Sequence, residues 1–591
     1  MKHLIYHTKE ISFPRIYFGR HIPLRMEREG ESLMVTFIIG LAILFVGGCL
    51  YGKFCESVFE PDDRETPAYA KQDGVDYVPM KTWKNSLINL LNIAGTGPIL
   101  GPIQGILFGP IAFLAIPIGN VIGGSMHDYM SGMICTRDGG TQMPDMIKNY
   151  TNKGVYILYD IFMCILLLLV GAVFIYTPGD ILSTQVLGFS GSATAVSTWV
   201  IYSCIFVYYL IATVFPIDKI IGRVYPIFGL ILIISAVGIF IAIFAKGYPL
   251  TDIWANWNTV SGTVSGSLGA AGGASDATMN VSGFDFAAYF KAGHFIPVFF
   301  LTVACGILSG FHSTQTALIS RTMESEKNGR MCFYNMMIVE GFIAMCWAAG
   351  TMGMINLGAD RGGVSILGAN KFLQASTEAA AMKDGALQAG YFAAENGSFY
   401  HIIAATSVVG VICKNAMGPI LGMIGLIGVI VLPITSGDTA LRALRLTLAD
   451  SLHLKQDNNG KRLGLAIPVF ILVYVILVWA KTDANGFNIL WRYFAWANQM
   501  ISLFALACIA AYLAMHNKKQ FMWIPLIPAA FYAFCTSTYL IHNPAQTAGT
   551  AFMSWNTAYV IGAIFTVCYL IVVVLNANKK ASAVKAASAK A

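Results

Sequence analysis

The sequence predicts an all-α polytopic membrane protein, and its composition, its apolar runs and the placement of its positive charges support this fold class. Of the 591 residues, 56% are hydrophobic and only 12% are charged, whereas a soluble domain has roughly a quarter charged residues. Runs of about 20 apolar residues recur along the chain, long enough to cross a hydrocarbon core of about 30 Å. We expect about 13 such spans.

Lysine and arginine lie in short clusters between the apolar runs, as they do on the cytoplasmic side of membrane proteins. The net charge of +7 therefore indicates topology rather than nucleic-acid binding. The 12 cysteines are scattered, mostly within apolar runs, and form no Cys-x-x-Cys pair. We interpret them as small hydrophobic residues, which predicts neither disulfides nor a zinc site.

The chain starts with a basic segment, 1–33, followed by a leading span at 34–51 and a cytoplasmic loop at 52–85. With that loop inside, segment 1–33 would lie outside, against the positive-inside rule. One hypothesis is that Met34 is the native start, because residues 27–31 can be encoded wholly by purines, as a ribosome-binding site is. The alternative is a basic extension that stays inside, with 86–135 crossing an odd number of times.

The remaining spans fall into two sets of five and a final pair. The first set occupies 86–245, with spans at about 89–109, 111–133, 155–177, 196–215 and 224–245. The second set occupies 294–514, with spans at about 294–318, 333–357, 399–440, 464–480 and 489–514. Residues 515–576 hold two C-terminal spans, about 523–538 and 552–576, before a basic cytoplasmic tail at 577–591.

The loops between these spans sort by charge. The basic loops, expected inside, are 136–154, 216–223, 319–332, 441–463 and 515–522. The loops expected outside are 178–195, the Gly/Ser-rich 246–293, 358–398, 481–488 and 539–551. The alternation holds if the apolar region 399–440 makes one net crossing, so part of it must bend back or form a re-entrant helix.

The first and sixth of the ten central spans are interrupted by glycine, proline and polar residues, at 92–102 and 306–316. They are five spans apart and run in opposite directions, as an inverted five-helix repeat predicts. Backbone groups freed at such breaks must face protein, water or a ligand. Close helix packing is the alternative role for the glycines. We expect a binding site where 95–98 meets 309–313. Its candidate residues are Asn92, Gly95, Thr96, Gly97, Gly310, His312, Ser313 and Gln315.

Ionisable residues at membrane depth are costly and usually functional. His127 could exchange a proton near neutral pH with Asp128 tuning it, or the two could form a helix-end network with Arg137. Glu340 is either a proton-coupling carboxylate or one partner of a buried pair. Two residues do not make a metal site, so no metal is expected.

Two further polar clusters follow. Thr435, Ser436 and Asp438 could hold a cation or a proton, or could equally cap a cytoplasmic helix. Arg492 opens a span at the expected outer surface with Asn498 and Gln499, where an aromatic belt explains the neighbouring Trp and Tyr but not these three. Arg492 could draw in an anion as a gate.

No catalytic signature is present: the chain has no Walker A motif, no Gly-x-Ser-x-Gly elbow and no His-Glu-x-x-His. The sequence therefore predicts a protein that is not an enzyme. We expect no cofactor, only a proton or cation gradient as the energy source.

These runs together resemble the carbon starvation protein A family along nearly the whole chain, from about residue 34 to the 570s. The runs that carry the resemblance are 66–68, 73–79, 92–102, 127–128, 137–140, 309–316, 434–445 and 491–499. The resemblance implies an inner-membrane carrier with the LeuT-type inverted repeat of the amino acid–polyamine–organocation superfamily. It also implies a cation between span one and the span-eight hydroxyls of Thr435 and Ser436, with Asp438 as a proton site. This chain is short for the family and lacks the extra spans of its long members.

Family members are associated with peptide uptake or with proton-coupled pyruvate uptake. The first hypothesis is therefore a multi-pass carrier of the bacterial inner membrane that imports a small anion such as pyruvate with protons during carbon starvation. The alternatives are a peptide carrier of the same architecture and a sensor that binds the metabolite without moving it. The expected partners are the small-molecule substrate and the lipid bilayer, with no nucleic acid.

Overall fold

The structure is a computed structural model that describes most of the chain from residue 34 to residue 588. The residues outside the description are 1–33, 75, 215–217, 256, 259–279, 282–294, 369–370, 384–385, 388–390, 394–397, 455–458, 484–485, 543–551 and 589–591. The predicted segment 1–33 and most of the predicted loop 246–293 therefore lie outside the described residues.

The leading span is one continuous helix built from α1 (Val35–Ala42), η1 (Ile43–Gly47) and α2 (Gly48–Phe59). A short helix, α3 (Pro67–Ala70), lies in the loop that follows. The continuous helix is longer than the predicted span of 34–51 because residues 52–59 extend its last two turns.

The first set of five spans contains one bent pair and several long helices. The bent pair is α4 (Thr82–Ile93) and α5 (Gly97–Gly105). The second span joins α6 (Ala112–Gly119), η3 (Asn120–Ser125) and α7 (Met126–Arg137). Beyond the short α8 (Met143–Tyr150) come α9 (Lys153–Ile181), α10 (Val196–Val214) and α11 (Asp218–Ala245).

The second set opens with a broken span made of α14 (Phe295–Thr302), α15 (Ala304–Ile307), η7 (Gly310–Thr314) and α16 (Thr316–Ser320). It continues with η9 (Arg330–Tyr334), α17 (Asn335–Leu357), α19 (Ala405–Ser451), α20 (Asn459–Thr482) and α21 (Gly486–Met515). The last two helices are α22 (Trp523–His542) and α23 (Trp555–Ser588).

The helix α19 changes direction at Gly418, whose φ of 76° and ψ of −177° are not helical. Pro419 follows it, and proline disfavours a helical conformation in the residue before it. The apolar region predicted to bend is therefore a strand up to Ala404, a helix up to the break, and a long second helix that runs to Ser451.

The outer segment before α19 contains a small antiparallel sheet, in addition to the helical fold that the sequence predicts. Its strand order is β3 (Ser365–Gly368), β4 (Lys371–Ser376), β8 (Phe399–Ala404) and β7 (Tyr391–Ala393). The central register pairs Lys371 with Ala404 and Ser376 with Phe399. These partners lie more than 20 residues apart, so local patterns did not reveal the sheet. Short pieces nearby are α18 (Glu378–Ala381), β5 (Met382–Lys383) and β6 (Ala386–Leu387), and β1 (Trp257–Asn258) pairs with β2 (Asn280–Val281).

Among the described residues, nine helices are long and apolar enough to cross a membrane, or ten if α4 and α5 count as one bent span. The other three predicted spans correspond to α6–α7, to α10 with its shorter apolar stretch, and to the broken α14–α16. The fold class of a mostly helical, multi-pass membrane protein is confirmed. The count of 13 and the inverted repeat stay predictions.

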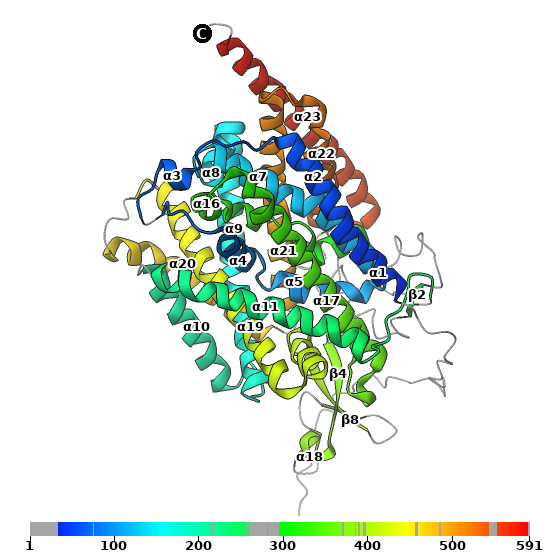
Figure 1. The fold of residues 1–591 in the computed structure, drawn as a ribbon. Coiled ribbons are helices and arrows are strands. Elements are labelled where there is room, and N and C mark those ends of the chain that lie inside the picture. The colour runs from blue at the N-terminus through cyan, green and yellow to red at the C-terminus, as the bar shows by residue number, and fades with distance from the viewer. Residues whose placement is uncertain are drawn as a thin grey trace, which may run out of the picture.

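Segments that the charge pattern predicts on opposite sides of the membrane lie at opposite ends of the molecule, and which end faces the cytoplasm stays a prediction. The C-terminal end of α23 lies at one end and the sheet with α18 lies at the other (Figure 1). At the first end Lys580 donates to the Asn149 carbonyl and Asn576 donates to the Tyr150 carbonyl, so the tail contacts the basic loop 136–154. The charge pattern had placed both of these segments inside.

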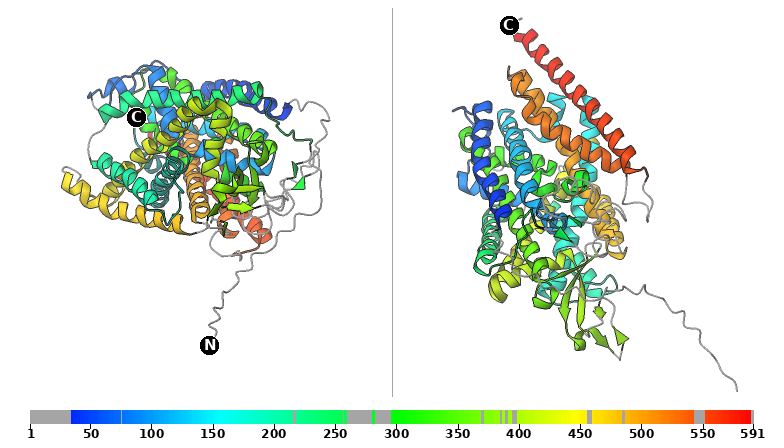
Figure 2. Two further views of the ribbon diagram at one scale, coloured as in Figure 1. Left: turned by 90° about the horizontal axis from the view of Figure 1, so that it is seen from below. Right: turned by 90° about the vertical axis from the view of Figure 1, so that its right-hand side faces the viewer.

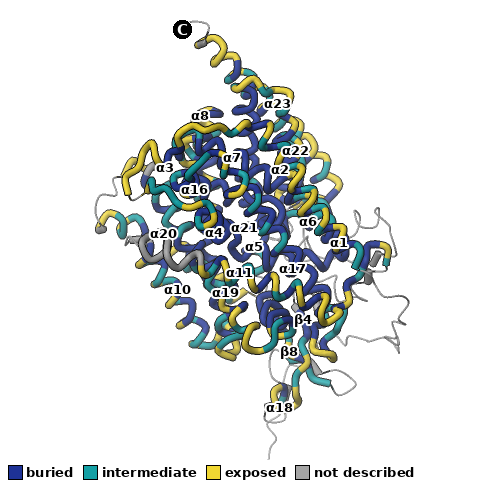
Figure 3. Tube along the Cα trace, in the orientation of Figure 1, coloured by how far each residue is buried: buried dark blue, intermediate teal, exposed yellow. Residues whose placement is uncertain are grey.

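The helices form a packed centre and an apolar periphery. The helices α5, α7, α17 and α21 are mostly buried, whereas α10, α20 and α23 expose much of their surface (Figure 3). Exposed residues on these outer helices include Val200, Ile471 and Val560, which suits a surface that faces lipid. The last two helices, α22 and α23, lie along one flank of the molecule (Figure 2).

Candidate functional site

The first broken span bends by 51° between α4 and α5. The helix stops at Ile93, and α5 restarts at Gly97 with Pro98 in its first turn, where proline is well tolerated. A Cβ atom at Gly97 would lie only 2.0 Å from the Cβ of Cys305. Gly97 therefore allows the two broken spans to touch, and this packing accounts for the glycine whether or not it also binds a substrate.

The sixth span is unwound at Leu308 and Ser309, both of which have extended backbone angles. The freed groups are held by Asn498 of α21, whose Oδ1 accepts from the Phe311 backbone N–H at 2.8 Å and from the Ser309 hydroxyl at 3.1 Å. Both breaks lie where the sequence predicts them, at 95–98 and 309–313. One backbone N–H freed from the helical ladder, that of Phe311, is thus satisfied by a protein side chain.

A second amide supports the same break from the other side. Asn120 of η3 donates through Nδ2 to the carbonyls of Gly306 and Met337, at 3.1 and 3.0 Å. The Ser125 hydroxyl donates to the Oδ1 of Asn120 at 3.1 Å. Asn120 thus links the second span to the sixth span, which contains the break, and to the seventh span, which contains Glu340.

Four titratable side chains from three spans form one buried group, which we call the His–Asp cluster: His127, Asp128, His312 and Glu340. The Nδ1 atoms of His127 and His312 lie 2.8 Å from the two carboxylate oxygens of Asp128. The Nε2 of His312 lies 3.5 Å from Oε2 of Glu340. All four residues are at most 2% exposed. Sequence reasoning named all four and paired His127 with Asp128, but it did not predict that His312 and Glu340 join them.

The proton positions in this cluster follow from donor and acceptor chemistry. An ionised carboxylate only accepts, so both imidazoles donate through Nδ1–H to Asp128. In its neutral form His312 then has an acceptor at Nε2, facing Glu340. The His312 Nε2 atom and both Glu340 carboxylate oxygens have no hydrogen-bond partner among the described residues. A proton on this pair belongs either to Glu340 as a carboxylic acid or to His312 as an imidazolium.

The other predicted binding residues surround the two breaks. Asn92 and Thr96 are buried at the first break, and the Asn92 Nδ2 and Thr96 Oγ1 atoms have no hydrogen-bond partner among the described residues. Ser313 and Gln315 bond within their own segment, to the Gly310 carbonyl and to the Thr314 hydroxyl. Close packing also surrounds two predicted glycines, since a Cβ at Gly95 would meet the ring of Phe174 and one at Gly310 would meet the backbone of α21.

The eighth span contacts the first through one of its predicted hydroxyls. Ser436 of α19 donates to the Leu91 carbonyl of α4 at 3.2 Å. The Thr435 hydroxyl donates to Leu432 within its own helix. Asp438 is fully buried and lies 3.8 Å from the Nη2 of Arg442.

Arg492 lies inside the molecule rather than on an exposed outer surface, since it is only 1% exposed. Its guanidinium donates to the Thr302 hydroxyl of α14 and to Oε1 of Gln104 of α5, the latter at 3.4 Å. Two turns further along α21, Gln499 donates to the Phe300 carbonyl. The gate role of Arg492 stays a prediction.

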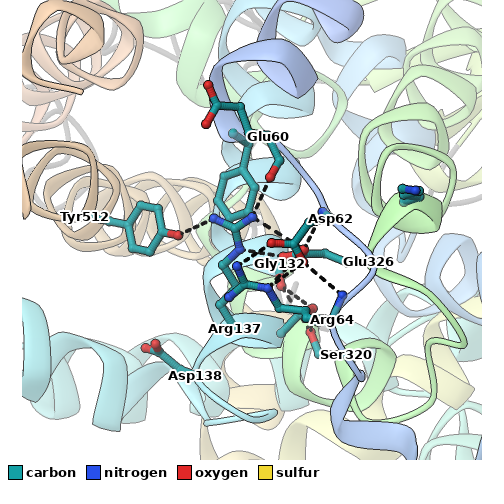
Figure 4. Close-up of polar contacts among 12 residues, drawn as sticks. Glu60, Asp62, Arg64, Gly132, Arg137, Asp138, Ser320, Glu326 and Tyr512 are labelled. Atoms are coloured by element: carbon teal, nitrogen blue, oxygen red, sulfur yellow. Dashed lines mark hydrogen bonds and ion pairs between the residues drawn. The ribbon is translucent and has the colours of Figure 1, made fainter. Parts of the chain in front are cut away.

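An ionic network links the segments around the basic loops 136–154, 319–332 and 515–522 (Figure 4). Arg137, the last residue of α7, donates to the carboxylate of Glu326, to the Tyr512 hydroxyl at 2.8 Å and to the Glu60 carbonyl at 2.7 Å. The backbone N–H of Asp62 donates to the same carboxylate of Glu326 at 2.9 Å. The network joins the ends of α2, α7 and α21 to the loop before η9.

Charges around this network shift the pKa values of the loop carboxyls. The Lys518 ammonium, which pairs with Glu60 at 2.9 Å, holds the pKa of that carboxyl below its ordinary value. Hydrogen bonds from Arg64 hold the pKa of Asp62 below its usual range. Burial instead raises the pKa of Asp138, partly offset by the hydrogen bond from Tyr150.

Sequence reasoning missed Asn120 and Glu326 as structural partners, and it named Asn498 only as unexplained. The available signal for Asn120 was a single amide within the apolar run of the second span. No local signal marks Glu326, because its partner Arg137 is 189 residues away. No three His, Cys, Asp or Glu side chains in the described part of the chain are arranged to hold a metal ion.

The chain is similar to known membrane transport proteins. It is 37% identical over 347 residues to an uncharacterized membrane protein of Haemophilus influenzae, covering 53% of this chain and 89% of that one. It is 24% identical to the peptide transporter CstA of Escherichia coli (86% of this chain, 81% of that one). It is 23% identical to the pyruvate/proton symporter BtsT of the same organism (86% and 82%).

A solved transporter structure is similar to the chain in fold. A manganese transporter of Eremococcus coleocola superposes with a TM-score of 0.51 and 10% identity, covering 86% of this chain and 98% of that one. At this identity the likeness concerns the fold alone. The CstA and BtsT relatives, which match most of the chain, are transporters, so the chain is a transport protein and not an enzyme.

The broken spans and the cluster between them lie inside the region that a family model recognises. The model of carbon starvation protein CstA matches residues 32–264 and 201–539, well over half of the chain. The chain therefore belongs to the carbon starvation protein CstA family of multi-pass bacterial membrane proteins.

Proposed function

We propose that this protein is a secondary active transporter of the bacterial inner membrane that imports a small carbon source, pyruvate with protons, during carbon starvation. The observation that carries the proposal is the His–Asp cluster, which links the unwound sixth span to the second and seventh spans. In this proposal the pair of His312 and Glu340 takes up a proton from water on one side of the membrane and releases it on the other. A proton gradient would then drive uptake without any cofactor.

The charge balance of the cluster favours coupling to protons. Neither Asp128 nor Glu340 forms an ion pair with a lysine or arginine among the described residues; their charged partners are His127 and His312. Without the proton shared by His312 and Glu340, two carboxylates would be buried with neutral imidazoles. Buried unpaired charge is strongly unfavourable, so the closed state retains this proton until one side opens to water.

A cation gradient is a second source of energy to consider. The contact between Ser436 and the Leu91 carbonyl brings span eight to the first break, where the LeuT-type fold would place a cation. Thr435, Ser436 and Asp438 are the proposed ligands of that cation. We place the proton first because the cluster lies directly on the sixth-span break.

Pyruvate and peptides are both supported as substrates by the names of relatives. Similarity to the pyruvate/proton symporter BtsT supports pyruvate as the substrate, and similarity to the peptide transporter CstA supports peptides. Asn92 and Thr96 offer unpartnered buried polar atoms beside the first break, so we propose that they bind the substrate together with Ser313 and Gln315. Pyruvate is the first choice, and peptide transport is the second candidate.

The test is uptake by purified protein in liposomes, with pyruvate and dialanine in parallel, with and without an inward proton gradient. We expect one of the two solutes to accumulate only with the gradient. Flux that ignores the proton gradient would refute symport with protons, and dependence on a sodium gradient would transfer the coupling role to Thr435 and Ser436. Saturable binding without flux would instead support a sensor.

The variants His312→Ala and Glu340→Gln remove the two groups that share the proton. We expect gradient-driven uptake to fall by about 100-fold, as for loss of a positioned proton-transfer group, while substrate binding persists. His453→Ala is the matched control, because His453 is exposed in a loop expected inside. Wild-type gradient dependence in both cluster variants would disprove the assignment.

A further inference from the structure

Arg492 is a buried cation for which the described residues provide no carboxylate. Its hydrogen bonds go to the Thr302 hydroxyl and the Gln104 side-chain oxygen, both neutral. Its Nε atom is buried and has no hydrogen-bond partner among the described residues. An uncompensated charge at membrane depth destabilises the fold, so such a residue is expected to serve a function.

The position of Arg492 connects it to both broken spans. Gln104 lies at the end of α5, the half of the first span that follows its break. Thr302 ends α14, the half of the sixth span that precedes its break. The charge pattern places both halves on the outer side. On the same face of α21, Gln499 contacts Phe300 and the neighbouring Asn498 holds the break itself.

The chemistry of the group selects one kind of ligand. A guanidinium presents five N–H donors in a planar fork that matches a carboxylate in two parallel hydrogen bonds. The hydrogen bonds to Thr302 and Gln104 come from Nη1 and Nη2 of Arg492 and leave its Nε–H for a ligand. One cation among neutral neighbours balances one negative charge, as a carboxylate carries.

We propose that Arg492, assisted by Thr302 and Gln104, is the subsite that binds the carboxylate of the transported solute as it enters from the outer side. This inference rests on the proposed function and deepens it, because it names the substrate class as a monocarboxylate, whether pyruvate or the C-terminus of a peptide. The Arg492 side chain then discriminates against uncharged analogues of the same shape.

The first measurement is thermal unfolding of the detergent-solubilised protein with added ligands. Pyruvate or dialanine should raise the midpoint, whereas pyruvamide and alanyl-alaninamide should not, because ligands that bind the folded state stabilise it. Arg492→Gln should remove the response to the carboxylates, and Arg492→Lys should retain part of it. Arg361→Gln is the matched control, since Arg361 is exposed in the outer segment and its loss should change nothing.

The second measurement is uptake in liposomes. Arg492→Gln should raise the KM for the carboxylate by about 10-fold or more, as expected for a lost charge-assisted hydrogen-bond pair, while the response to the proton gradient remains. Equal stabilisation of the wild type by acids and amides, or a wild-type KM in Arg492→Gln, would overturn the subsite. If carboxylates stabilise the protein in an Arg492-dependent way but no flux occurs, the subsite stands and the transport proposal fails.

A structural role for Arg492 predicts a different pattern. In that case Arg492→Gln would lower the unfolding midpoint without ligand, and Arg492→Lys would do the same with no partial rescue of binding. If Arg492→Gln does not fold, Thr302→Val is the substitute. It removes one neutral partner, and a KM for the carboxylate that stays at the wild-type value would count against the subsite.

Discussion

At the residue scale, Asn498 lies at the point where the sixth span loses its helical hydrogen bonds. Its Oδ1 accepts from two groups of the break, and its Nδ2 donates to the Cys305 sulfur at 3.2 Å. The residue is fully buried. A single amide therefore holds the unwound backbone in a form that places His312 beside Asp128.

Replacing Asn498 by leucine should leave the Phe311 N–H buried without a partner. We expect the free energy of unfolding to fall by about 1–3 kcal/mol, and uptake to fall with it because His312 loses its fixed position. Thermal unfolding in detergent and liposome uptake measure the two effects. Asn335→Leu is the control, since Asn335 is more exposed and, among the described residues, its side chain bonds only the Met331 sulfur. Equal effects in both variants would contradict this role.

At the element scale, α19 is divided by Gly418. A Cβ at Gly418 would meet none of the described residues within 4 Å, so its backbone angles are what restrict the position. Its positive φ with extended ψ is nearly exclusive to glycine. The break turns the helix between the outer sheet and the long inner part that carries Ser436.

Gly418→Ala should cost about 1–3 kcal/mol of stability through backbone strain alone. Gly464→Ala, in the regular helix α20, also places its Cβ in open space, and alanine there should stabilise the helix by about 0.5–1 kcal/mol. Thermal unfolding of the two single variants gives the comparison. Unchanged thermal stability in Gly418→Ala would indicate that the break shifts along the helix at no cost in free energy.

At the scale of the whole molecule, ion pairs link separate segments at both ends. At the inner end Arg137 and Glu326 link four segments. At the outer end the Lys481 ammonium lies 2.7 Å from Asp180 Oδ1, and the Thr406 hydroxyl bonds the other oxygen of Asp180. A transport cycle with alternating access would open one of these ends while the other stays closed.

Arg137→Gln should destabilise the protein by about 1–3 kcal/mol, because the buried Glu326 carboxylate loses its nearer charged partner and keeps the longer contact to Arg64, at 3.5 Å. The double variant Arg137→Gln with Glu326→Gln should lose less stability than the two single variants lose together. Lys327→Gln breaks an exposed pair with Asp63 and should change stability by less than about 1 kcal/mol. Additive losses in the double variant would show that the pair is not coupled.

The same network predicts a dependence on pH. The pKa values of Glu60 and Asp62 are lowered in the folded state. The two carboxylates therefore stabilise the folded state fully at pH values above their unfolded-state pKa of about 4. This stabilisation is lost as the pH falls further towards the folded-state values. The free energy of unfolding should therefore fall as the pH drops below about 4, and this fall should be smaller in high salt.

Much of this protein follows from its sequence alone. The membrane class, most of the spans, the two breaks and the chemistry-bearing residues His127, Asp128, His312 and Glu340 could be predicted, because each depends on local hydropathy, on glycine and proline, or on the cost of a charge in lipid. Only the tertiary structure decided which of these residues meet. Asp128 and His312 are 184 residues apart, and Arg492 and Gln104 are 388 apart. Such contacts, like the β4–β8 pairing, depend on how whole spans pack, and no local pattern encodes that.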